Sequence, residues 1–142
     1  MSAETVENVE NTETLQDSIL MSVRASCKVS EEDNGFDHEL IPLINTYLMM
    51  ANHELGIGIN GFTINGTTQT WADWLGAAEE KLAAVKTWVG MNVLLIFDPP
   101  DNASVIKSYE ETIQKLGWEL ASKSWLEGHT QTIYPPEYVE ED

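Results

Sequence analysis

Basic side chains are scarce in this sequence of 142 residues: 7 lysines and arginines stand against 24 aspartates and glutamates, and the formal net charge at pH 7 is −17. A surface of this kind repels phosphate groups, which argues against sequence-specific binding of DNA or RNA. It also argues against attachment to anionic membranes. The acidic charge keeps such a chain soluble, and it suits a surface that must lie near nucleic acid without adhering to it.

Cysteine is almost absent, since Cys27 is the single one. One cysteine cannot build a disulfide framework, so we expect a reducing compartment and a Cys27 that packs as a small apolar group. Long apolar runs are absent too. The longest, near residues 88–97, has about ten residues, whereas a membrane-spanning helix needs about 20. The N-terminus lacks the basic and apolar regions of a signal peptide, and none is predicted.

Motifs for catalysis and for cofactor binding are missing or lie in the wrong context. Gly56, Gly58 and Gly61 have the spacing of the dinucleotide-binding fingerprint, but they follow a predicted helix and enter a predicted hairpin. The three histidines are scattered and have no cysteine pair beside them, so no metal is expected. We therefore predict no catalytic residue, no cofactor and no enzyme activity.

Most of the chain instead has apolar residues at three- and four-residue steps, the period of amphipathic helices. We predict main helices over residues 15–28, 37–55, 79–97 and from 103 to past 120, and a short helix over 71–75. Thr14 with Asp17, and Thr70 with Asp73, have the capping-box spacing that opens a helix. The expected buried positions are Leu15, Ile19, Val23, Cys27, Leu40, Ile44, Leu48, Ala51, Leu55, Leu82, Val85, Val89, Val93, Ile96, Val105, Tyr109, Ile113, Leu116 and Leu120.

The helix that begins at Glu79 is apolar on most sides, because a second stripe lies beside its buried one: Ala84, Trp88, Met91 and Leu95. Such a helix must be covered on most sides, by the rest of a bundle or by a neighbouring subunit. The double proline at residues 99–100 ends it abruptly, since proline cannot continue a helix.

The predicted fold class is therefore mainly α: a small helical bundle of four main helices plus a short helix. Between the second and third main helices, residues 56–70 form a Gly/Asn-rich β-hairpin or loop, with Phe62–Ile64 as one strand and Asn65-Gly66 at the turn. Three segments are expected: an acidic flexible arm over 1–14, a helical domain over 15–122, and a C-terminal tail over 123–142. The tail is either a hook for a partner or disordered.

Two tryptophans fall outside the buried stripe of the last helix. Trp118 lies opposite the stripe at 100° per residue, and Trp125 follows seven residues later. A tryptophan on the outer face of a small bundle needs cover. Either the chain's own tail folds over it, or it contacts a neighbouring copy or a partner.

In combination, these features resemble the head–tail connector proteins (adaptor or head-completion proteins) of long-tailed bacteriophages. The resemblance covers roughly residues 15–121. The matching stretches are Asp17-Ser18-Ile19-Leu20, Phe36-Asp37-x-Glu39-Leu40, Ile44-Asn45, Leu55-Gly56-Ile57-Gly58, Phe62-x-Ile64, Thr70-Trp71-x-Asp73-Trp74-Leu75-Gly76, Val85-Lys86-Thr87-Trp88-Val89, Leu94-Leu95-Ile96-Phe97-Asp98-Pro99-Pro100 and Trp118-Glu119-Leu120.

The resemblance implies a structural virion protein that forms a ring, usually of twelve copies, between the portal and the stopper or tail. Its partners would be other copies of itself, the portal protein and a stopper or tail-completion protein. Double-stranded DNA would pass through without specific binding, and no membrane is involved. The protein would reside in the virion neck, and in the host cytoplasm during assembly. The residues expected at subunit or partner interfaces are Phe62, Ile64, Trp71, Trp74, Trp88, Trp118, Trp125, Ile133, Tyr134 and Tyr138.

The alternative is an acidic interaction module, such as a DNA mimic that inhibits a host nucleic-acid-binding protein. The acid count fits such a mimic. A mimic, however, should present ordered rows of carboxylates on its folded surface, and many of the acidic residues here lie near the two ends of the chain.

Overall fold

Four main helices and one short helix make up the fold of the described residues. The computed structural model describes residues 17–76 and 79–128. Its elements are α2 (Ile19–Ser26), α3 (Asp37–Leu55), α4 (Trp71–Leu75), a single 3-10 turn η1 (Glu79–Lys81), α5 (Leu82–Phe97) and α6 (Ala103–Gly128). The described residues contain no strand, so the predicted mainly α bundle is confirmed. Within the same ranges, no helix combines the length and apolar character needed to cross a membrane.

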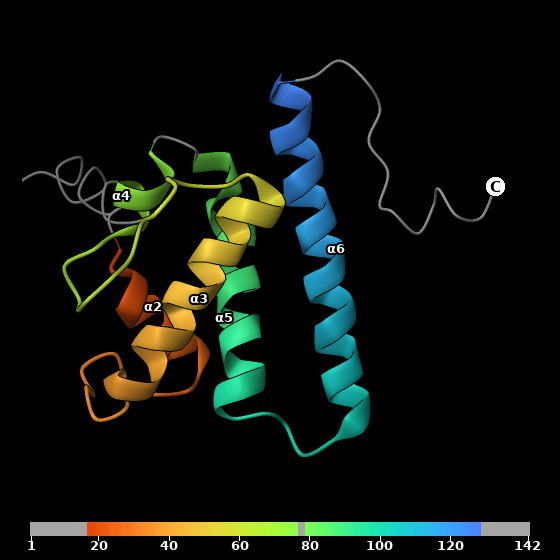
Figure 1. Ribbon diagram of the computed structural model, residues 1–142. Helices are drawn as coiled ribbons and strands as arrows, with labels where there is room; N and C mark the ends of the chain where they lie inside the picture. Colours follow the sequence, from red (N-terminus) through yellow and green to blue (C-terminus); the bar gives the residue numbers. More distant parts are fainter. Residues whose placement is uncertain (1–16, 77–78, 129–142) are drawn as a thin grey trace, which may run out of the picture.

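Helix α5 lies at the centre of the bundle and contacts α2, α3 and α6 (Figure 1). Its predicted buried stripe is confirmed except at its end. Leu82, Val85, Val89 and Val93 are buried, but Ile96 is 56% exposed. Ile96 lies in the last turn of α5, beside the loop to α6 and at the end of the bundle, where less of the neighbouring helices remains to cover it.

The first helix is shorter than predicted, and its predicted cap is wrong. It begins at Ile19, and the Ser18 hydroxyl accepts a hydrogen bond from the Met21 N–H, so Ser18 is the N-cap in place of Thr14. The backbone just before the helix is hydrogen-bonded to residues 69–71. Ser18 forms an antiparallel bridge with Thr70, the residue before α4. In it, Trp71 N donates to Asp17 O at 3.1 Å, and Ile19 N donates to Gln69 O at 3.0 Å.

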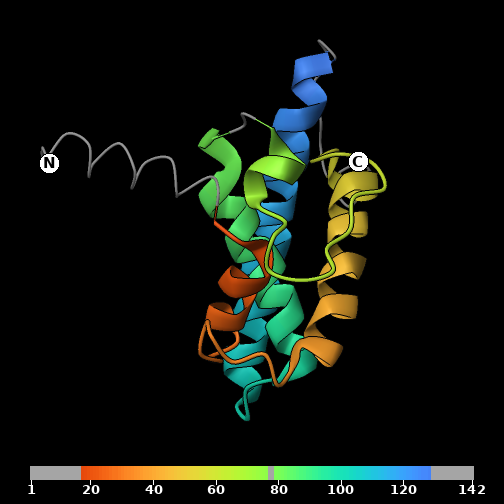
Figure 2. The ribbon, with the colours of Figure 1, turned by 90° about the vertical axis from the view of Figure 1, so that its left-hand side faces the viewer.

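Of the two predicted alternatives for residues 56–70, hairpin or loop, the structure has the loop, and side-chain amides of α3 bind its backbone. Asn45 on α3 pairs with Ile64 in both directions: Asn45 Nδ2 donates to Ile64 O at 3.1 Å, and Ile64 N donates to Asn45 Oδ1 at 2.8 Å. Two helical turns further along α3, Asn52 Nδ2 donates to the carbonyl oxygens of Ile57 and Gly58. The loop is therefore held against α3 at two points (Figure 2).

The helix predicted from Glu79 begins as the 3-10 turn η1, and α5 itself starts at Leu82, but three other predicted helix ends are confirmed. Thr70 and Asp73 form the complete capping box of α4. Gly56 ends α3 in the left-handed conformation, with φ of 71°. Asn102 accepts a bond from Ser104 N at 2.7 Å at the start of α6. Helix α6 then continues to Gly128, so it includes residues 123–128 of the segment assigned to the tail.

We expect Asn45→Ala to lower the free energy of unfolding by about 1–3 kcal/mol, because it leaves the half-buried N–H and C=O of Ile64 without their partner. Urea denaturation measures this. Asn60→Ala, at an exposed position of the same loop, is the control and should change the value by no more than about 0.5 kcal/mol. Equal losses in the two variants would contradict the role of Asn45.

Burial, with a smaller contribution from the negative charge of Asp98, raises the pKa of Cys27 from 9.0 to about 11. The thiol therefore loses its proton at lower pH in the unfolded chain than in the folded protein. Its contribution to stability is complete below about pH 9 and is lost as the pH rises toward about 11. Urea denaturation between these pH values should show a steeper loss for the native chain than for Cys27→Ala. Burial also raises the pKa of Tyr47, but both chains share this tyrosine. Parallel pH profiles would refute the prediction.

Candidate functional site

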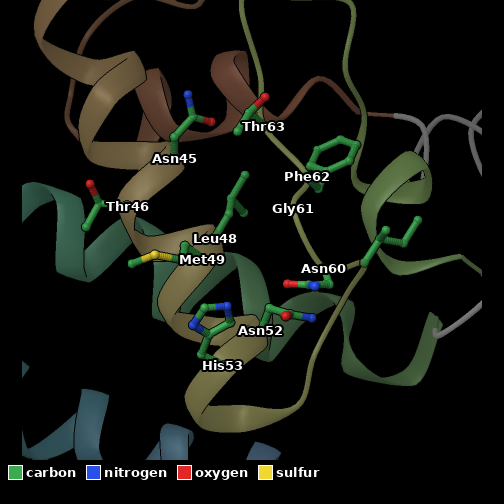
Figure 3. A pocket seen from close by; sticks show the side chains of 11 residues that line it. Asn45, Thr46, Leu48, Met49, Asn52, His53, Asn60, Gly61, Phe62 and Thr63 are labelled. Atoms are coloured by element: carbon green, nitrogen blue, oxygen red, sulfur yellow. The ribbon is translucent and has the colours of Figure 1, made fainter.

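One hollow on the described surface is a groove between α3 and residues 59–63 (Figure 3). It has a volume of about 340 Å³. Met49 and Ile59 lie along it with 48% and 55% of their surfaces exposed, and Phe62 is half-buried. The lining residues are Asn45, Thr46, Leu48, Met49, Asn52, His53, Ile59, Asn60, Gly61, Phe62 and Thr63.

The groove exists because the loop is held beside α3 and cannot collapse onto it. The amides of Asn45 and Asn52 hold the loop at each end through its backbone. At the second point Gly58 has φ of 77°, and a Cβ there would lie 2.1 Å from Trp74 Nε1. A glycine is therefore required where the loop passes over Trp74, and the loop keeps its path along the groove.

A second apolar position lies on the outer side of α6. This helix stands at one edge of the bundle and contacts α5 and α3 (Figure 1). Trp118 is 36% exposed, as predicted for the side opposite the buried stripe. Of that stripe, Leu120 is buried and Val105 is 38% exposed, since Val105 lies in the first turn, at the end of the bundle.

A third apolar region, which the sequence reasoning missed, lies at the end of the bundle where α3 begins and α5 ends. Phe36 is 42% exposed and packs edge-to-face against Phe97, with ring centroids 5.4 Å apart. Ile96 is next to Phe97 and is 56% exposed. The available signal was that Phe36, like Met49, is a large apolar residue outside the predicted buried stripes.

Four of the predicted interface residues lie in the core of the subunit. Trp71 and Trp74 are 0% exposed, Ile64 3% and Trp88 6%. Trp71 Nε1 donates to Ser22 Oγ at 3.0 Å, so this indole connects α4 to α2. Side chains with so little exposed surface shape the subunit and offer little area to a neighbour.

The remaining predicted residues divide into two groups. Phe62 lines the groove and Trp118 is exposed on α6, so both are placed where a neighbour could contact them. Trp125 belongs to α6, but its side chain is outside the described part of the structure, and Ile133, Tyr134 and Tyr138 lie outside the described residues.

The site has the chemistry of a binding surface. The groove offers apolar side chains and amides, and His53 is its one ionisable lining residue. Among the described residues, no group of three or more His, Cys, Asp or Glu side chains is arranged to hold a metal ion.

Comparison with known proteins agrees with a structural role. A protein-family model described as "Phage connector protein" matches residues 19–125, which include α2 to α5 and most of α6. Searches of curated proteins and of solved structures found no match to this chain.

Proposed function

The chain belongs to the phage connector protein family and has a structural head–tail connector role, and we propose that it acts as a ring of identical subunits. The ring would contain twelve copies and lie in the virion neck, between the portal and the stopper or tail. DNA would pass through it during ejection. The work of such a ring is mechanical, because it joins two assemblies and makes or breaks no bond.

The observation that carries this proposal is the exposed tryptophan on α6. Trp118 is 36% exposed on α6, the helix at the edge of the bundle. Large aromatic side chains bury extensive area when they enter an interface, which is why they are frequent among the residues that dominate binding. The other apolar regions, in the groove and around Phe36, lie elsewhere on the subunit, as contacts to more than one neighbour require.

The acidic charge supports the passage of DNA. A net charge of −17 on each copy gives a ring that repels phosphate groups, so DNA would move through it without being held. The chain of a DNA mimic would bind through its carboxylates, which leaves the three apolar regions without a purpose.

A density map of the neck of the assembled phage tests the ring directly. We expect copies of this fold arranged around the DNA channel, between the portal and the stopper or tail, with the twelvefold repeat of the proposed ring. Particles made without the chain provide the control and should contain DNA-filled heads that lack tails. A neck without this fold, or tailed particles that assemble without the chain, would contradict the proposal.

We expect Trp118→Lys to reduce attachment of the protein to heads by at least about tenfold, because a lysine replaces apolar area with a charge inside the proposed interface. The melting temperature should change little, since the tryptophan is not in the core. Ser108→Lys introduces the same residue at an exposed position of the same helix, about 15 Å along the axis and roughly 80° around it from Trp118, and should leave attachment unchanged. Electron microscopy of heads mixed with each variant measures this. Equal attachment of both variants would exclude Trp118 from the interface.

A further inference from the structure

The groove between α3 and residues 59–63 contains no carboxylate. The chain carries 24 acidic residues, yet none of the eleven residues that line the groove is acidic. Figure 3 shows Asn52, His53 and Asn60 together at one end of it. His53 and Asn60 are exposed and can donate hydrogen bonds, while Met49 and Ile59 offer apolar contacts. A segment that carries both apolar and acidic residues fits this lining better than it fits the rest of the surface.

We propose that this groove binds the C-terminal segment, residues 129–142, of a second copy of the chain. The proposal rests on the proposed ring and names a contact between its neighbouring subunits. The segment has the complementary chemistry, since Ile133 and Tyr134 precede two prolines and four acidic residues follow at 137 and 140–142. Two consecutive prolines exclude a helix and favour an extended conformation. Extended proline-containing segments bind grooves that present an aromatic side chain, and Phe62 provides one here.

The direction of α6 favours a second copy over the segment's own subunit. The loop and α6 lie on opposite sides of α3 and α5 in both ribbon views (Figures 1 and 2). Helix α6 also extends past the start of α5, to Gly128, and so carries the chain away from its own groove. Fourteen extended residues span at most about 50 Å, enough to reach an adjacent subunit.

The symmetry of such a contact agrees with a ring. Each copy would have one groove and one C-terminal segment, so each subunit would receive a segment from one neighbour and give its own to the next. A contact between two different surfaces of identical subunits is heterologous, and when its rotation closes it forms a ring.

Disulfide trapping tests the contact in the concentrated full-length protein. In a Cys27→Ala background, one chain carries Tyr134→Cys and a second carries Met49→Cys, and the two are mixed under mild oxidation. We expect a disulfide between the two different chains, since bridging requires Cα atoms within about 7 Å. A chain with Val105→Cys, exposed at the end of the bundle, replaces the groove chain in the control. Its yield should be at least tenfold lower.

A matched pair of isoleucine variants tests the groove itself. Ile59→Asp, added to the Met49→Cys chain, should lower the disulfide yield at least tenfold. Ile96→Asp replaces an equally exposed isoleucine (56% against 55%) outside the groove and should leave the yield unchanged. Circular dichroism should show the same helical content and melting temperature for both variants.

Three results would overturn the inference. These are equal yields for Met49→Cys and Val105→Cys, an Ile59→Asp yield that equals that of Ile96→Asp, or no disulfide between separate chains when a chain that carries both Tyr134→Cys and Met49→Cys does form one within itself. A ring seen in the neck map together with any of these results would leave the proposed function intact and remove only this contact. Specific trapping without a ring in the neck would leave the contact between two copies intact and remove the proposed function.

Discussion

The whole structure depends on covering one apolar helix. Helix α5 has apolar side chains on most of its circumference, so it is stable in water only when other elements surround it. Three helices do so, and two glycines let them approach closely. A Cβ on Gly90 of α5 would lie 2.5 Å from Ser26 Oγ at the end of α2, and one on Gly117 of α6 would lie 3.2 Å from Trp88 Nε1. At both points a side chain of one helix therefore lies directly against the bare backbone of the other.

Polar contacts then fix how the flanking elements meet this core. Arg24 is 3% exposed, and it forms a paired contact with Asp37: Nε donates to Oδ1 at 3.1 Å and Nη2 to Oδ2 at 2.7 Å. Its Nη1 donates to the carbonyl oxygen of Glu31. Removing Asp37 would leave the charge of the buried Arg24 without compensation, so this contact ties the start of α3 to α2. Lys86 and Asp17 form a more exposed pair that connects α5 to the chain before α2.

Local signals in the sequence predicted most of this fold. These signals act within a few residues, so they can be recognised from the sequence alone. They are the buried stripes, the capping box at Thr70 and the double proline after α5. The choice between hairpin and loop for residues 56–70 stayed open because the amide that pairs with Ile64 belongs to Asn45, nineteen residues away on another element. The start of α2 was wrong for the same reason, since its preceding backbone pairs with a segment some fifty residues later.

The candidate site was harder to predict, because an apolar residue gives the same signal whether it fills a core or a contact between subunits. The tryptophans of α4 were assigned to an interface and are buried in the subunit. Trp118 was identified because its helix was long enough to define an outer side. The groove could not be predicted, since it depends on two amides of α3 that hold a loop at a fixed separation.

Helix α6 also acts as a spacer. Its end extends past the bundle, so its length sets how far from the core the chain resumes after Gly128. Each residue added to the helix advances that exit by about 1.5 Å and rotates it by about 100°. An insertion of seven residues would move the exit outward by about 10 Å and preserve its direction, whereas two residues would turn it toward the opposite side. A change in the length of α6 therefore keeps the direction in which the chain leaves it only when the added or removed residues make up nearly whole helical turns.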